Sequence, residues 1–181
     1  MVSVILIILF IWGFYVGFRR GFILQLVYTA GCTISYIAAS TYYRHLANFL
    51  ELFVPFPSAN SGTKMKFFSE AQTLDLDKFF IAGVAFFLIY LVCYFLFRLL
   101  AIFVYGLRLI PFFGGINKIL GGLGGLASVF LTSFMVLKLL TILPVNSLQS
   151  MLYKDILVQA MMERIPFFSQ NLQNLWVDKL I

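Results

Sequence analysis

The sequence predicts an all-α membrane protein with four transmembrane helices and an additional interfacial helix near the C-terminus. Three observations lead to this prediction. Hydrophobic residues make up 62% of the 181 residues and charged residues only 11%, against roughly 45–50% and about 25% in ordinary globular domains. The charged residues stand mainly between long apolar runs. Phenylalanine occurs 22 times, which suits side chains that face lipid or its interface.

The first two predicted spans are Val2–Phe18 and Phe22–Tyr43, and neither contains an ionised side chain. The first resembles a signal peptide in length, but its basic residues, Arg19 and Arg20, follow the apolar run instead of preceding it. No small-residue cleavage site follows at the right distance, so we interpret this run as a retained span. The second span carries more polar groups than the others, Gln25 among them.

The third and fourth predicted spans are Phe79–Phe97 and Ile119–Leu143. The third is uncharged and rich in Phe, Leu, Ile and Val, whereas the fourth begins with several glycines and contains one charge, Lys138. Runs of this length fit a hydrocarbon core of about 30 Å. The apolar segment between them, Arg98–Lys118, contains Pro111 and two adjacent glycines. We interpret it as an extension of the third helix followed by a break.

Two longer polar segments complete the chain. The segment Arg44–Lys78 holds two prolines and a turn-prone run of Ser, Ala, Asn, Gly and Thr, which is typical of a loop. The tail, Val145–Ile181, contains a predicted helix over Ser147–Glu163 that ends before Pro166. Apolar residues recur loosely on one face of that helix, so we expect it to lie on the membrane surface.

The distribution of charge predicts an orientation. If the turn at Arg19-Arg20 faces the cytoplasm, so does the segment after the third span, and neither contains an acidic residue. All seven acidic residues fall in the two longer segments on the opposite side. The positive-inside rule then places both termini outside the cytoplasm and makes residues 44–78 an extracytoplasmic loop.

Small residues recur at every fourth position along three of the spans. This spacing places small side chains on one helix face, where it lets backbones approach closely inside a membrane. We predict that these residues pack helices within the bundle, with contacts between identical chains as the alternative. The predicted packing residues are Gly13, Gly17, Gly21, Gly31, Ser35, Ala39, Gly121 and Gly125.

Two polar side chains within the spans are candidates for a polar path across the membrane. Lys138 is the charge that lies well inside a span, and such charges often mark ion or proton paths. Because it lies near the end of its run, snorkelling of its stem to the interface is the more conservative interpretation. Gln25 is expected to face protein and to hydrogen-bond a neighbouring helix, with the lining of a pore as the alternative.

The sequence shows no pattern typical of catalysis, metal binding or cofactor binding. It lacks an HExxH motif and a nucleophile–base pair, and its single histidine excludes a histidine-based metal cluster. The glycines of residues 121–125 lack the lysine of a phosphate-binding loop. Cys32 and Cys93 lie in spans at different depths, so we expect no disulfide. The net charge of +6 is scattered, and nucleic acid is not an expected partner.

Several short motifs follow one another in a characteristic order. Gly17-Phe18-Arg19-Arg20-Gly21-Phe22 joins the first two spans, and Asn117-Lys118 precedes Gly121-x-x-x-Gly125 at the start of the fourth. This order resembles the CvpA family, the colicin V production proteins, over most of residues 1–145. Val129 stands where another glycine often continues the family's series. The family-motif residues are Arg20, Gly21, Phe22, Asn117 and Lys118.

The resemblance implies a small multi-pass protein of the bacterial inner membrane, tied to production or export of a peptide toxin and to envelope function. Because the glycines serve packing and no catalytic pattern is present, we expect a non-enzymatic accessory protein of this type without a cofactor. Its expected partners are the lipid bilayer, other membrane proteins or copies of itself. A small transporter or channel subunit is the alternative. A weaker third hypothesis is a membrane-embedded enzyme, with Asp75, Asp77 or Asp155 lining a cavity that opens to the outside.

Overall fold

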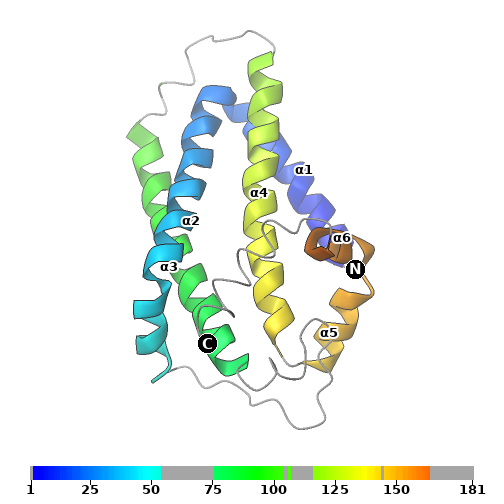
Figure 1. Cartoon of the computed structure of the whole chain (residues 1–181). Helices are drawn as coiled ribbons and strands as arrows, with labels where there is room; N and C mark the ends of the chain where they lie inside the picture. Colours follow the sequence, from blue (N-terminus) through cyan, green and yellow to red (C-terminus); the bar gives the residue numbers. More distant parts are fainter. Residues whose placement is uncertain (1, 54–75, 104–105, 107–115, 144, 164–181) are drawn as a thin grey trace. The chain divides into compact units, whose positions relative to one another are not determined.

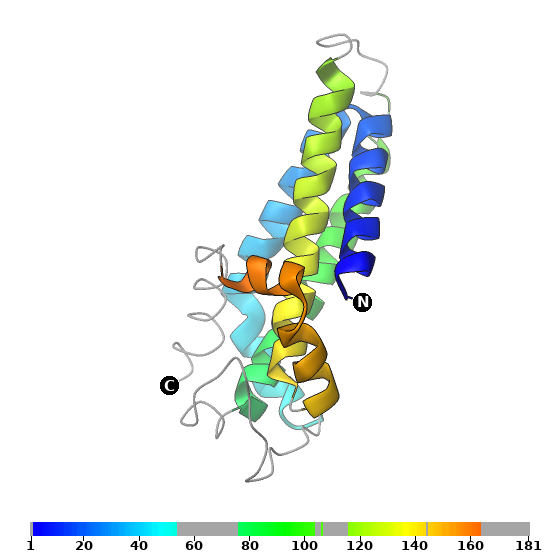
Figure 2. The same ribbon diagram turned by 90° about the vertical axis from the view of Figure 1, so that its right-hand side faces the viewer.

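The structure, a computed structural model, describes residues 2–53, 76–103, 106, 116–143 and 145–163. The regular elements in this part of the chain are all helices (Figure 1). The helices are α1 (Val2–Arg20), α2 (Phe22–Leu50), α3 (Leu76–Phe103), α4 (Ile116–Ile142), α5 (Asn146–Tyr153) and α6 (Ile156–Glu163). Figure 2 shows the same helices after a rotation of 90°.

The predicted fold class is confirmed, because α1, α2, α3 and α4 are all long and apolar enough to cross a membrane. Many of their large apolar side chains point outward, including Ile8, Trp12, Val92 and Phe95. Water would make such exposure costly, whereas lipid does not. The span in α1 is the least covered, with 17% of it buried against 39% in each of the other three.

The second span is longer than predicted, because α2 continues past Tyr43 to Leu50. Arg44 and His45 point away from the packed face, so their charge and polarity do not stop the helix. On the opposite face Ala47 packs with Ile81 and Ala85 of α3. Packing between helices therefore extends α2 into the segment that the sequence assigns to a loop.

The predicted tail helix is divided in the structure. One helix was predicted over residues 147–163, but α5 ends at Tyr153 and α6 begins at Ile156. Asp155 stands directly before α6, and its carboxylate accepts a hydrogen bond from the backbone N–H of Val158. This is the geometry of a helix N-cap, so Asp155 starts a new helix instead of continuing the old one.

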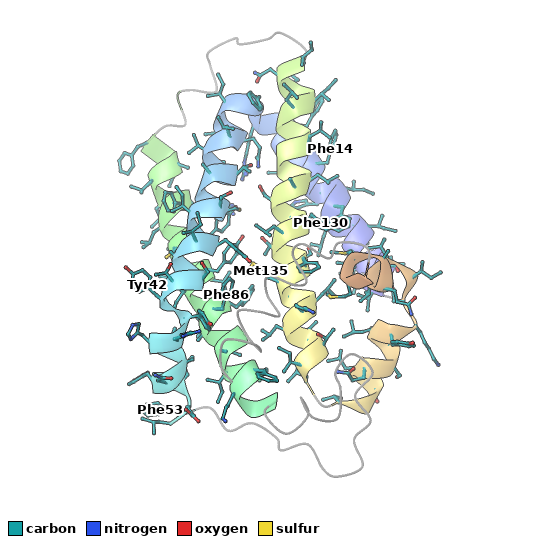
Figure 3. The ribbon with its side chains drawn as sticks, in the orientation of Figure 1. Phe14, Tyr42, Phe53, Phe86, Phe130 and Met135 are labelled. Carbon is teal, nitrogen blue, oxygen red and sulfur yellow. The ribbon has the colours of Figure 1, made fainter. Side chains whose placement is uncertain are left out.

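The chain divides into two compact units. The glycine unit comprises residues 4–39 and 88–133, and the tail unit comprises the described residues within 1–3, 40–87 and 134–181. In the tail unit Phe86 is fully buried and its ring lies 6.2 Å from that of Tyr43, at an interplanar angle of 60°. Figure 3 shows Tyr42, by contrast, pointing outward from α2.

Candidate functional site

In the glycine unit, α1 and α4 pack backbone against backbone. A Cβ atom added to Gly17 would overlap the carbonyl oxygen of Gly121 and lie 2.9 Å from the Cα atom of Gly125. A Cβ atom added to Gly121 would lie 2.5 Å from the carbonyl oxygen of Gly17. One added to Gly125 would overlap the carbonyl oxygen of Gly13. We call these four glycines the glycine seam, and none of them has room for a methyl group.

Val129 continues the seam with a side chain in place of a glycine. A Cβ atom added to Gly13 would lie 2.5 Å from Cγ2 of Val129. The valine therefore occupies the space that Gly13 leaves open, which explains why a bulky residue is tolerated where the series of glycines ends. Nearby, the rings of Phe10 on α1 and Phe130 on α4 lie 6.1 Å apart.

The turn between α1 and α2 is held by a residue far along the chain. Gly21 has a φ of +80°, a conformation that glycine adopts without the steric cost other residues incur. The backbone N–H of Phe22 donates a hydrogen bond of 2.8 Å to Oδ1 of Asn117 in the first turn of α4. This bond satisfies one of the free N–H groups at the beginning of α2. Three of the five family-motif residues thus meet in one contact.

The two basic residues of the family motif lie beside this contact. The guanidinium of Arg20 lies 4.0 Å from the ring centroid of Tyr28, a distance that permits a cation–π interaction. Lys118, next to Asn117 on α4, is exposed, as is Arg19 at the end of α1. The motif therefore combines a hydrogen-bonded turn with exposed positive charge at one end of the unit.

Gln25 belongs to a polar network buried between helices. Its side chain is 2% exposed, and Nε2 lies 3.4 Å from the hydroxyl oxygens of both Thr29 and Ser128. The two hydroxyls lie 3.3 Å from each other. Oε1 of Gln25 has no hydrogen-bond partner among the described residues. The predicted contact of Gln25 with a neighbouring helix is therefore present, but the amide is only half satisfied.

The network continues through residues that the sequence reasoning missed. The hydroxyl of Tyr90 on α3 lies 2.9 Å from that of Thr132 and 3.6 Å from the sulfur of Cys32, to which it donates. The spacing of these polar residues in the sequence does indicate part of the network. Residues 25, 29 and 32 share one face of α2, and residues 128 and 132 share one face of α4. Tyr90 lies within an apolar run without such a spacing of polar residues, so its place in the network could not be predicted from the sequence.

The small residues of α2 have a different neighbour from those of α1. A Cβ atom added to Gly31 would lie 3.0 Å from Cβ of Phe97 on α3. Ser35 is buried, and its hydroxyl donates to the carbonyl oxygen of Gly31 at 2.7 Å. Ala39, one turn further, is fully buried. The small residues of α2 therefore do not belong to the glycine seam: Gly31 contacts α3, whereas the seam joins α1 to α4.

In the tail unit, polar side chains hold the ends of three helices. The amide nitrogen of Gln149 donates to the carbonyl oxygens of Thr141 at 2.6 Å and Leu143 at 3.1 Å, where α4 ends. The carboxylate of Asp155 accepts from the backbone N–H of Ser3 at 2.9 Å and also from the Ser3 hydroxyl. Burial alone would raise the pKa of Asp155, but the hydrogen bonds from Ser3 and Val158 hold it below its usual value.

The remaining candidates of the sequence analysis are not brought together. Lys138 is half-buried on α4, and within the described ranges no carboxylate pairs with its ammonium group. It belongs to the tail unit and Gln25 to the glycine unit, so a polar path through both stays a prediction. Asp75 lies outside the described residues, as does the side chain of Asp77. Among the described residues, no group of three or more His, Cys, Asp or Glu could hold a metal ion.

Comparison with known proteins identifies relatives over almost the whole chain. A family model described as colicin V production protein matches residues 2–166. An uncharacterized transmembrane protein of Bacillus subtilis (strain 168), YshB, is 30% identical over 179 residues, which is 98% of each chain. No solved structure matches the chain.

Proposed function

Since the chain belongs to the colicin V production protein family, we propose that it is a non-enzymatic accessory protein of the bacterial inner membrane. Its role is to support production or export of a peptide toxin, and envelope function more broadly, through contacts with other membrane proteins. Both termini lie outside the cytoplasm in this proposal.

The observation that supports an accessory role is the use of the family-motif residues in packing. Gly21, Phe22 and Asn117 join the turn between α1 and α2 to α4, and the glycine seam closes the space between α1 and α4. Residues packed in this way are not available to bind or convert a substrate. A rigid helix pair with a broad outward face suits a protein that positions partners in the bilayer.

Photo-crosslinking in native membranes tests this proposal. A photoreactive residue at Trp12 of α1 or Val92 of α3, 57% and 59% exposed, is expected to yield discrete protein adducts. The matched control is Leu24 of α2, which is 1% exposed and is expected to yield none. Robust solute flux through liposomes that contain only the purified protein would count decisively against an accessory role.

The buried polar network favours a small transporter or channel subunit as the second candidate. An amide oxygen without a partner is costly in a membrane, and such groups are retained where they serve a function. If Gln25 and Lys138 line a path, Gln25→Leu and Lys138→Met each alter transport or growth. Wild-type behaviour of both variants eliminates this candidate.

A further inference from the structure

A groove runs between α1 and α4 on the outside of the glycine unit. Its volume is about 260 Å³, and its lining residues are all apolar: Ile7, Phe10, Ile11, Phe14 and Leu126. The glycine seam brings the two backbones close, so the larger side chains beside it form walls. A Cβ atom added to Gly122 would lie 2.6 Å from the ring of Phe14, which shows that this ring lies directly on α4. Such a groove in a lipid-facing surface accepts a hydrocarbon chain.

Two basic residues stand beyond one end of the groove, where α1 ends and α4 begins. On α4, Lys118, Gly122 and Leu126 recur at every fourth position and therefore share one face. On α1, the ring of Phe14 stacks on that of Phe18 with centroids 6.1 Å apart. Arg19 follows Phe18 in the last turn of α1, and its guanidinium lies 6.0 Å from the ring centroid of Tyr15, beside the groove. The hydrogen bond between Phe22 and Asn117 holds these two helix ends together.

The charge at this end has no counterpart within the unit. Residues 4–39 and 88–133 contain five Lys and Arg but no Asp or Glu. Arg19 and Lys118 are exposed. Their positive charge is therefore available to an anionic group from outside the unit.

We propose that the groove and these two basic residues form a binding site for an anionic phospholipid of the surrounding leaflet. One acyl chain lies against Phe10 and Leu126, and the headgroup phosphate lies between Arg19 and Lys118. Eight residues separate Lys118 from Leu126, which is about 12 Å along the helix. That distance fits within one leaflet, which is about 15 Å of hydrocarbon deep.

Native mass spectrometry of the purified full chain in detergent tests the site. The protein is titrated with phosphatidylglycerol or with phosphatidylcholine of the same acyl chains, and the dissociation constant of the first bound lipid is measured for each. The wild type is expected to bind phosphatidylglycerol about tenfold more tightly or better. Arg19→Gln and Lys118→Gln are each expected to weaken that binding about fivefold, which corresponds to about 1 kcal/mol per basic residue.

Two further variants separate the site from general attraction between charges. Arg98→Gln removes an exposed charge from α3 in the same unit and is expected to leave the preference for phosphatidylglycerol unchanged. Leu126→Trp fills the groove without altering charge and is expected to weaken phosphatidylglycerol binding severalfold. Circular dichroism of each variant verifies that the helices are retained.

Four outcomes would overturn the proposal. Equal binding of the two lipids to the wild type would show ordinary lipid contact without selectivity. An effect of Arg98→Gln equal to that of Lys118→Gln would show diffuse attraction. Full binding by Leu126→Trp would show that the groove holds no acyl chain. A dimer that persists with added lipid, but becomes monomeric in Leu126→Trp, would assign the groove to a second copy of the chain.

Discussion

Gly17 packs against the backbone of Gly121, whereas Gly13 packs against the side chain of Val129. The two glycines look alike in the sequence, since both belong to the same four-residue spacing. They differ in what can move aside when a methyl group is added. A valine side chain can be shortened by mutation, but a carbonyl oxygen cannot. A double mutant can therefore test which group each glycine contacts, in addition to testing whether the position tolerates a larger residue.

We predict that Gly13→Ala and Gly17→Ala each reduce the free energy of unfolding by about 1–3 kcal/mol, because both force atoms into occupied space. Adding Val129→Ala is expected to recover part of the loss in Gly13→Ala, because Cγ2 of Val129 is removed while its Cβ atom, 2.9 Å from the added methyl group, remains. It is expected to recover little of the loss in Gly17→Ala. The measurement is unfolding in mixed detergent micelles. Gly106→Ala is the control, because a Cβ atom there meets none of the described residues within 4 Å. Equal recovery of both variants would contradict this assignment of contacts.

Asn117 permits a second test at this scale. Asn117→Ala removes the acceptor for the N–H of Phe22 and is expected to cost about 1 kcal/mol, as loss of a helix cap does. Asn117→Asp keeps an acceptor oxygen near the N-terminus of α2 and is expected to retain most of the stability. Hydrogen exchange at the Phe22 amide is the direct measurement. Unchanged protection in Asn117→Ala would show that the bond does not hold the turn.

Among the helices, α5 and α6 depend most clearly on a contact between residues that are far apart in the sequence, namely Asp155 and Ser3. The carboxylate of Asp155 begins α6 and at the same time binds Ser3 at the beginning of α1. One side chain thus joins two helices that are separated by most of the chain. Its position outside the four spans makes it accessible to changes in pH.

The tail unit is therefore expected to lose stability in acid. Burial of Asp155 opposes its charge, but the hydrogen bonds from Ser3 and Val158 hold its pKa below the usual 3.8. A group with a lowered folded-state pKa contributes its stability above its unfolded-state pKa and loses it as the pH falls through the folded value. We predict that proteolysis at α5–α6 accelerates as the pH falls below about 3.8. Asp155→Asn is expected to remove this pH dependence, and a response identical to wild type would contradict the role of Asp155.

At the scale of the whole molecule, the orientation in the membrane is the property that the contacts within the chain leave open. The positive-inside rule places residues 44–78 and the tail outside the cytoplasm. Cysteines introduced at Ser61 and Ser147, in a background of Cys32→Ser and Cys93→Ser, are expected to react with an impermeant thiol reagent in intact cells. A cysteine at Lys118 is the matched control and is expected to react only after lysis. If the cysteine at Ser61 or the one at Ser147 were protected from the reagent, the predicted topology would be wrong.

Much of the fold could be predicted because membrane insertion depends on the composition of each segment by itself. Long apolar stretches with at most one ionised side chain determine four spans, whatever the rest of the chain does. The extension of α2 to Leu50 could not be read in the same way, because it depends on Ala47 meeting Ile81 and Ala85 of α3. At the division of the tail helix, Asp155 caps α6 locally, but its hydrogen bond with Ser3 at the beginning of α1 could not be predicted from the sequence.

The sequence by itself determined that this protein lies in a membrane, how many helices are long enough to cross it, and to which family the chain belongs. Only the tertiary structure decided that the glycines of α1 meet those of α4 while those of α2 meet Phe97. It also decided that Asn117 completes a turn 95 residues away, and that an apolar groove lies between α1 and α4. The reason is physical: the transfer of a segment into hydrocarbon is a sum over its own residues, whereas close packing depends on which surfaces meet in three dimensions.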